Sequence, residues 1–176
     1  MVLDNVEYSL YGIVIVFMNP KYLLALILPL TLAACQQASI PDCGELPEDK
    51  HVGNAGCMII RDEQLLMVQQ QVTGNWSMPG GTAEAGERAA CTAQRETLEE
   101  TGLSVIPIHK ITTLQNGFHL YRCEINREIA AQSLDRLEIA DWRFFDEQAR
   151  GEIPWRFEKQ HELIDQLVRE QLQTGE

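Results

Sequence analysis

Short apolar runs separated by polar turns fill the middle of this chain and predict β-strands. The first two runs cover residues 57–60 and 65–68, and the charged residues 61–63 between them suit a tight turn, so we expect a β-hairpin. Residues 35–50, by contrast, are mostly polar and include two prolines, which is typical of a tether. We therefore expect one folded domain over residues 51–173.

Three further strands and a helix are predicted in the second half of the chain. Residues 105–113, 118–125 and 137–145 are rich in β-branched and aromatic residues, and Asn116-Gly117 is a strong signal for a two-residue hairpin turn. At 157–172, apolar residues recur at helical spacing, which predicts an amphipathic helix covering a sheet. Strands flanked by helices indicate an α/β fold with helices on the faces of a sheet.

A different pattern separates the two groups of strands. Residues 88–101 lack Pro and Gly and are rich in Ala, Glu, Gln, Arg and Leu, so they are predicted to be helical. Gly102 suits the left-handed position that ends a helix. Residues 76–81 before the helix include Pro79 and two glycines, which allow the backbone to approach whatever the helix binds.

Three carboxylates crowd one side of one turn of this helix. At about 100° per residue, Glu99 and Glu100 fall within roughly 60° of Glu96 on either side, and Arg95 is spaced to pair with Glu99. Like charges at this spacing destabilise a helix unless a cation lies between them, and oxygen ligands favour Mg²⁺ or Mn²⁺ over zinc. Most Glu-rich helices are simply solvated acidic surfaces, so the carboxylates alone do not establish a metal site.

The same stretch resembles the Nudix box, G-x5-E-x7-R-E-U-x-E-E-x-G-U, in which U is bulky and apolar. The matching residues are Gly81, Glu87, Arg95, Glu96, Glu99, Glu100, Gly102 and Leu103. The single departure is Thr97 at the first U position, where its methyl group can still face a core. Eight fixed positions within 23 residues make this a specific match.

This resemblance implies an α/β/α sandwich with a mixed sheet and a hydrolase that cleaves a nucleoside diphosphate linked to another group, X. Nucleotide sugars, dinucleoside polyphosphates, ADP-ribose-like compounds and isoprenoid diphosphates are the candidate substrates. The resemblance also implies that Glu96, Glu99 and Glu100 are ligands of Mg²⁺ or Mn²⁺, with the backbone carbonyl of Gly80 completing the shell. A non-catalytic ligand-binding module is the alternative, although a complete box favours the enzyme.

Other roles in the site follow from the same resemblance. Arg95 would orient Glu99 and limit repulsion among the acids. Either Glu99 or Glu100 would act as general base, and the box does not decide between them. Glu87 would be a peripheral ligand or an acid favoured by the helix dipole. Glu138, outside the box, is a candidate further ligand, with a surface acid at a strand end as the alternative.

The overall charge limits the partners. A formal net charge of −12 and a pI near 4.7 argue against electrostatic binding of nucleic acid or of an anionic membrane surface. A polyanionic small-molecule substrate would also be repelled. A bound cation would therefore be needed for substrate entry as well as for chemistry.

Residues 1–34 are predicted to be a targeting segment outside the fold. The apolar run 23–34 is too short to cross about 30 Å of hydrocarbon as a helix, but it fits the hydrophobic region of a signal peptide that starts at Met18. Residues 32–35, Leu-Ala-Ala-Cys, resemble a bacterial lipobox in which Cys35 is lipid-modified.

Such a signal predicts a lipoprotein on the periplasmic side, at the outer membrane, because Gln rather than Asp follows Cys35. The alternative is an uncleaved anchor over residues 8–34 that keeps the domain facing the cytoplasm, where a nucleotide house-cleaning pyrophosphatase would be the expected activity. Polar residues in the middle of that segment make this anchor costly. The oligomeric state does not follow from the sequence.

Four cysteines remain once Cys35 is assigned to lipid. In an oxidising compartment Cys43, Cys57, Cys91 and Cys123 would pair, and three connectivities are open. We favour Cys43–Cys57 and Cys91–Cys123. The alternative is four buried thiols in a cytoplasmic protein.

Overall fold

The computed structural model describes residues 9–10, 13–14, 46, 49–128 and 137–174 of the 176-residue chain. The chain divides into two compact units, residues 1–37 and 38–176. In the first unit, β1 (Ser9–Leu10) and β2 (Ile13–Val14) form an antiparallel pair. No helix in the described residues is both long and apolar enough to cross a membrane. The predicted lipobox and Cys35 lie outside these residues.

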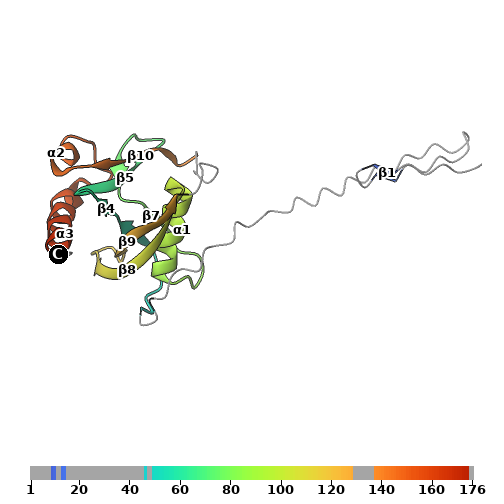
Figure 1. The fold of residues 1–176 in the computed structure, drawn as a ribbon, viewed down its shortest axis with the longest axis horizontal. Coiled ribbons are helices and arrows are strands. Elements are labelled where there is room, and N and C mark those ends of the chain that lie inside the picture. Colours follow the sequence, from blue (N-terminus) through green and yellow to red (C-terminus); the bar gives the residue numbers. More distant parts are fainter. Residues whose placement is uncertain (1–8, 11–12, 15–45, 47–48, 129–136, 175–176) are drawn as a thin grey trace, which may run out of the picture. The chain divides into compact units, whose positions relative to one another are not determined.

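The second unit contains two four-stranded sheets (Figure 1). In the first sheet, β5 pairs with three antiparallel neighbours; its strands are β4 (Ile60–Arg61), β5 (Gln64–Gln70), β6 (Trp76–Ser77) and β10 (Ile139–Phe145). The second sheet has the order β7 (Gly80–Gly81), β3 (Ala55–Met58), β9 (His119–Glu128), β8 (Leu103–Thr113). Strands β3 and β9 are parallel and their other neighbours antiparallel, so this sheet is mixed, as predicted.

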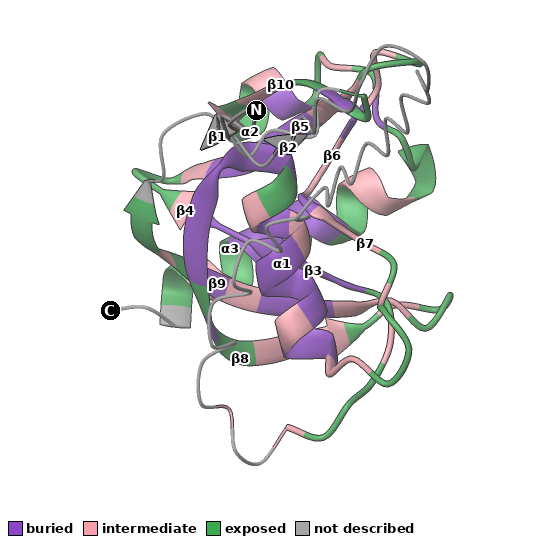
Figure 2. Cartoon of the chain, turned by 90° about the vertical axis from the view of Figure 1, so that its right-hand side faces the viewer, coloured by how far each residue is buried: buried purple, intermediate pink, exposed green. Residues whose placement is uncertain are grey.

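Two helices cover opposite faces of these strands. The helix α1 (Ala89–Thr101) packs in one buried cluster with Cys57 and Leu66, and α3 (His161–Thr174) packs in another with Met58 and Leu65. Successive side chains of a strand point to opposite faces, which is why neighbours in sequence join different clusters. Figure 2 shows the buried residues along the central strands and on α1. The arrangement confirms the predicted α/β/α sandwich.

The predicted limits of the first helix are confirmed, whereas the second, α3, begins at His161 instead of residue 157. Arg88 is the N-cap of α1, and Gly102 ends the helix at φ 74°, where its N–H donates to the Leu98 carbonyl at 2.8 Å. Two short helical segments, α2 (Glu147–Arg150) and the 3₁₀ turn η1 (Glu158–Gln160), precede α3 and were not predicted as separate elements.

The prediction of one strand over residues 57–60 was wrong. Strand β3 ends at Met58 in the second sheet, and β4 begins at Ile60 in the first, so the chain changes sheets at Ile59. Only β4 forms the predicted hairpin with β5, around a turn in which Asp62 and Glu63 have positive φ. An apolar run buried on both faces has no alternation of polar and apolar residues, so its sequence does not show where the chain passes from one sheet to the other.

The predicted turn at Asn116-Gly117 is confirmed as a hairpin between β8 and β9, but its loop is longer than two residues. It runs over residues 114–118, and the Leu114 N–H donates to the Phe118 carbonyl at 2.8 Å. Only Gly117 has positive φ, whereas a two-residue type I′ turn needs positive φ at both central residues.

Both favoured disulfide pairings were wrong. Cys57 of β3 is bonded to Cys123 of β9, and both side chains are fully buried among the residues beneath α1. Parallel neighbouring strands bring these cysteines together although 66 residues separate them in sequence. Cys91 is also disulfide-bonded, and Cys43 lies outside the described residues.

Candidate active site

Arg95 is at the centre of the acidic side of α1, and all five of its N–H groups are used. Its Nε and Nη2 donate to the two carboxylate oxygens of Glu87 at 3.0 and 2.9 Å. Its Nη1 donates to Glu96 at 2.9 Å and to Glu99 at 3.0 Å, and Nη2 also reaches the Thr82 carbonyl at 2.9 Å. One guanidinium therefore fixes three carboxylates, more than the single pair with Glu99 that we expected.

Glu87 anchors this arginine. Its oxygens accept the two Arg95 hydrogen bonds together with the Glu84 N–H and the Thr92 hydroxyl. Burial raises the pKa of Glu87, but these hydrogen bonds outweigh it, and the net effect is a pKa below its usual value. Glu87 thus holds Arg95 in place, a role that the sequence analysis missed.

The glycines of β7 are packed against two of the box acids. The Gly80 N–H donates to a carboxylate oxygen of Glu100 at 2.8 Å. A Cβ on Gly81 would lie 2.5 Å from the Glu96 carboxylate, and a Cβ on Gly80 would lie 2.5 Å from the Gly56 Cα. Only glycine at 80 and 81 leaves room for the two carboxylates and the neighbouring strand. The contact shown by Gly80 is made by its N–H, whereas the resemblance implied its carbonyl.

The electrostatics of these two acids fit a divalent cation. Burial raises the pKa of Glu100 to about 8; the charges of Glu96 and Glu138 add to the rise, while the Gly80 N–H and the charge of Arg156 oppose it. Burial also raises the pKa of Glu96 despite its hydrogen bond with Arg95. Buried carboxylates whose charge is only partly balanced by neighbouring donors, and which offer oxygen ligands alone, suit Mg²⁺ or Mn²⁺.

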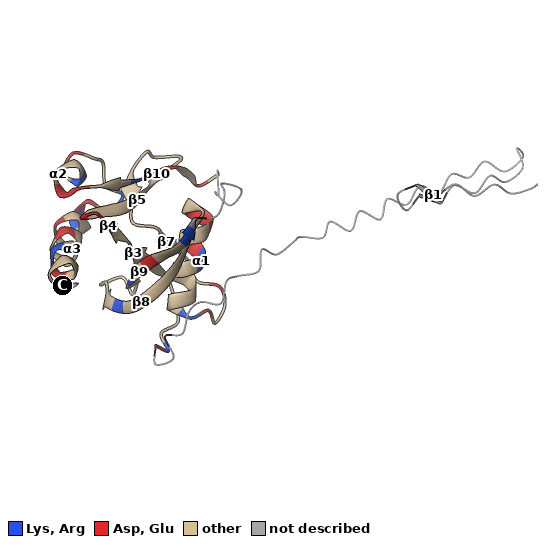
Figure 3. Cartoon of the chain, in the orientation of Figure 1, with Lys and Arg blue, Asp and Glu red and all other residues tan. Residues whose placement is uncertain are grey.

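The predicted ligands are not all gathered at one point. Glu96 and Glu100 lie against β7, whereas Glu99 is half exposed and bonded to Arg95. Glu138 is exposed just before β10, but close enough for its charge to act on Glu96 and Glu100. Within the described ranges, no three His, Cys, Asp or Glu side chains are already close enough together to hold a metal ion. Figure 3 shows acidic residues beside a basic one on α1.

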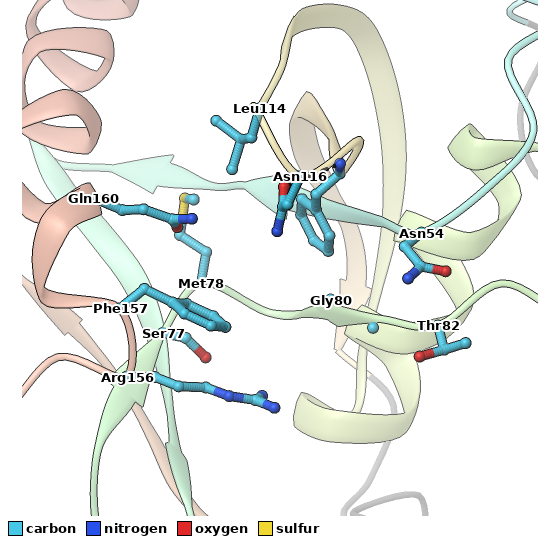
Figure 4. Close-up of a pocket in the computed structure, with 12 residues that line it drawn as sticks. Asn54, Ser77, Met78, Gly80, Thr82, Leu114, Asn116, Arg156, Phe157 and Gln160 are labelled. Carbon is cyan, nitrogen blue, oxygen red and sulfur yellow. Dashed lines mark hydrogen bonds between the residues drawn. The ribbon is translucent and has the colours of Figure 1, made fainter.

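A pocket of about 210 Å³ opens beside the same glycines (Figure 4). Its walls come from β7, from the β8–β9 loop and from the segment before α3; the lining residues are Asn54, Ser77, Met78, Gly80, Gly81, Thr82, Leu114, Asn116, Phe118, Arg156, Phe157 and Gln160. Trp76, by contrast, is 6% exposed and belongs to the core. Sequence reasoning missed Arg156 in this lining and counted Phe157 only as an apolar residue of the predicted helix 157–172; an arginine next to an aromatic residue at the start of that helix was the available signal.

Comparison with known proteins gives the family. The NUDIX domain model matches residues 50–167, which include every residue of the site described above. The chain therefore belongs to the Nudix family, and the hydrolase names among its relatives place it with the Nudix hydrolases.

One relative, a "MutT-like protein" of Streptomyces ambofaciens, is 28% identical over 114 residues, covering 62% of this chain and 73% of that protein. Alignments with four further curated relatives span less than half of those proteins. Two solved structures share the fold. A UDP-X diphosphatase has a TM-score of 0.55 at 23% identity, over 69% of this chain and 64% of that one. An ADP-ribose pyrophosphatase from Streptococcus suis has a TM-score of 0.57 at 20% identity, over 67% and 90%.

Proposed function

We propose that this protein is a Mg²⁺- or Mn²⁺-dependent hydrolase of the diphosphate bond in substrates of the type nucleoside diphosphate-X. The observation that carries the proposal is the packing of Glu96 and Glu100 against Gly80 and Gly81 inside a complete Nudix box. The names of the two solved structures, a UDP-X diphosphatase and an ADP-ribose pyrophosphatase, are consistent with this substrate class.

Glu96 and Glu100 would hold the cation, with Glu99, Glu138 and Gly80 as the further candidate ligands. A divalent cation bound there supplies positive charge to the phosphate oxygens and activates water. Arg95 keeps the carboxylates in place through its bonds to Glu87, Glu96 and Glu99, so that little reorganisation is needed when substrate binds. The general base is Glu99 or Glu100.

The test is chromatographic detection of the two phosphate-bearing products of diphosphate cleavage, from a panel of UDP-sugars, ADP-ribose, dinucleoside polyphosphates and deoxynucleoside triphosphates, with and without Mg²⁺. We expect turnover of at least one diphosphate-linked substrate and its loss in Glu100→Gln. Glu162→Gln, which removes an exposed acid of α3, is the matched control and should retain full turnover. Equal rates in wild type and Glu100→Gln would remove the metal-site account, and no turnover of any substrate would favour the binding module.

We also propose that the enzyme acts outside the cytoplasm as a lipoprotein anchored through Cys35. The buried bond between Cys57 and Cys123 supports an oxidising compartment, because stable disulfides are rare in reducing ones. Mass spectrometry of the mature N-terminus should find acylated Cys35 in bacterial membranes. An unprocessed Met1 or Met18 would refute the anchor and favour the cytoplasm-facing alternative.

A further inference from the structure

Cys57 lies where the elements that carry the acidic site meet. Its backbone N–H donates to the Pro79 carbonyl at 3.0 Å, immediately before the glycines of β7. Its sulfur lies 3.6 Å from the Ala93 carbonyl of α1 and is bonded to Cys123 of β9. A single residue of β3 therefore contacts α1, β9 and the segment that leads into β7.

The contact between β3 and β7 leaves little room for movement. The two strands pair at two positions, through Gly80 and Gly81. A Cβ on Gly56 of β3 would lie 2.4 Å from the Pro79 carbonyl oxygen, so the two backbones would have to move apart for any larger residue. A displacement of β3 therefore also displaces Gly80, whose N–H donates to Glu100 at 2.8 Å.

Hydrogen bonding alone holds β3 weakly, because the strands concerned are short. Strand β3 has four residues and β7 has two. The pairing of β3 with β9 is parallel, and the bonded cysteines of the two strands are 66 residues apart in sequence. Parallel pairs are slightly less stable per residue than antiparallel ones, and closing a long loop costs entropy. The disulfide adds a covalent bond to this pair of strands.

The disulfide also lies directly beneath the helix that carries the acids. Cys57 and Cys123 are fully buried in one cluster with the alanines of α1. Because alanine side chains are short, the helix backbone comes close to the sulfurs, as the 3.6 Å contact at Ala93 shows. Glu96 and Glu100 follow Ala93 by three and seven residues, which places them on the same side of the helix. The two sulfurs therefore help to set the distance between these acids and the sheet.

We infer that the disulfide between Cys57 and Cys123 positions the acids that bind the cation. It fixes β3 beside β9 and supports α1, and so keeps Glu96 and Glu100 at the distance from β7 at which the Gly80 N–H reaches Glu100. The two cysteines are positioning residues, since they act through β3 and α1. This inference rests on the proposed function, which assigns the cation to these acids.

The first test compares the Mg²⁺ affinity of wild type and of two double variants, measured by calorimetry on the whole protein without substrate. Cys57→Ala/Cys123→Ala removes the bond. Cys57→Val/Cys123→Ala removes it but keeps more of the buried volume, which guards against loss of folding through an empty cavity. We expect both variants to bind Mg²⁺ about ten- to a hundredfold more weakly, as when residues that orient metal ligands are removed.

Amide hydrogen exchange of the metal-free protein is the second measurement. In both double variants the Gly80 N–H should exchange faster relative to the Gly102 N–H, which donates to the Leu98 carbonyl at the end of α1. This measurement needs neither cation nor turnover. If wild type bound no Mg²⁺ while Gly80 still exchanged faster in the variants, the hydrolase proposal would fail and the positioning role would stand.

Ile164→Ala is the matched control. It removes buried volume from the cluster around α3 and lowers the stability without touching the disulfide, and urea unfolding shows how far its stability matches that of the double variants. Its Mg²⁺ affinity and its relative Gly80 exchange should stay as in wild type. Wild-type values of both quantities in the double variants would overturn the inference. Equal losses in Ile164→Ala would overturn it too, because they would trace the effect to stability alone.

Discussion

Two buried arginines on opposite sides of the sheets differ in how their charge is balanced. Arg150 of α2 is 1% exposed and faces one carboxylate, that of Asp165, at 2.8 Å, with a further bond to the Phe145 carbonyl at 2.9 Å. Arg95 is 8% exposed and faces three carboxylates, those of Glu87, Glu96 and Glu99. The Arg150–Asp165 pair is electrically neutral. The second has an excess of negative charge that the protein alone does not neutralise.

This difference separates a structural ion pair from a functional site. A buried pair with matched charges fastens two elements together, here α2 and α3. A buried cluster with surplus carboxylates is unfavourable by itself, and it makes sense if a cation binds there. Burial of an arginine is therefore a poor guide to function, whereas the local sum of charges is a good one.

The largest expected loss of stability follows from replacing Arg150, the arginine of the structural ion pair. Arg150→Met leaves the Asp165 carboxylate buried with only His161 nearby, and such broken pairs cost about 3–5 kcal/mol of unfolding free energy. Urea unfolding measures the loss, and folded molecules should keep the wild-type turnover. Arg150→Met combined with Asp165→Leu should recover much of the stability. A double variant as unstable as the single one would contradict the balanced-pair account.

A smaller effect is expected when the surplus charge is neutralised. Mg²⁺ at a hundred times its Kd should raise the free energy of unfolding by about 2.7 kcal/mol, because the folded state alone holds the site. The increase should vanish in Glu96→Gln/Glu100→Gln and persist in Glu152→Gln/Glu162→Gln, which removes two exposed acids. Thermal unfolding with and without Mg²⁺ measures this stabilisation. Stabilisation that survives in the first double variant would place the cation elsewhere.

Arg95→Lys probes the geometry of the functional cluster at constant charge. Lysine has three donors from one point and cannot serve Glu87, Glu96, Glu99 and Thr82 together, so we expect hydrolysis to fall by about ten- to a hundredfold, as when outer ligands of metal sites are lost. Steady-state kinetics at several Mg²⁺ concentrations measure it. Arg169→Lys is the control for an exposed arginine. Unchanged kinetics in Arg95→Lys would show that only the charge matters.

The smallest expected effect on stability comes from the Asp49 carboxylate, which is hydrogen-bonded at the start of the domain. Burial raises the pKa of Asp49, but hydrogen bonds from the Tyr121 hydroxyl and from His51 outweigh it and lower the pKa to about 2 from 3.8. A lowered folded-state pKa stabilises the fold above pH 4, and this contribution is lost as the pH falls from 4 to 2. With solvent screening it is worth less than about 1 kcal/mol.

Urea unfolding of wild type and Asp49→Asn between pH 2 and pH 7 isolates that contribution. The difference between the two proteins should be largest above pH 4 and should shrink toward pH 2. Tyr121→Phe removes the main hydrogen-bond partner and should give the same pH dependence at reduced amplitude. A difference that is constant over the whole range would exclude the Asp49 carboxylate as its source.

Local patterns in the sequence predicted much of this molecule. The limits of α1 follow from Gly102 and from the run of good helix formers, and the α3 helix follows from its apolar spacing. The pairing of Arg95 with Glu99 follows from helical periodicity alone. These features could be predicted because helix and strand periodicity depends only on residues a few positions apart in the sequence.

Contacts between distant segments could not be predicted in the same way. The bond from Cys57 to Cys123 depends on β3 lying beside β9, and the pocket depends on Arg156 and Phe157 reaching the glycines of β7. Neither arrangement leaves a local pattern. The change of sheet at Ile59 was missed for the related reason that a strand buried on both faces looks the same in either sheet.

The disulfide beneath α1 has a topological consequence. Cys57 and Cys123 close a covalent ring of chain, and that ring contains β7, the whole of α1 and every residue of the Nudix box. A protease that cuts once inside the ring leaves two pieces that are still tied to each other. The carboxylates, the glycines beside them and the arginine that holds them would then stay on one molecule, so a nicked enzyme in an oxidising environment would keep its parts together.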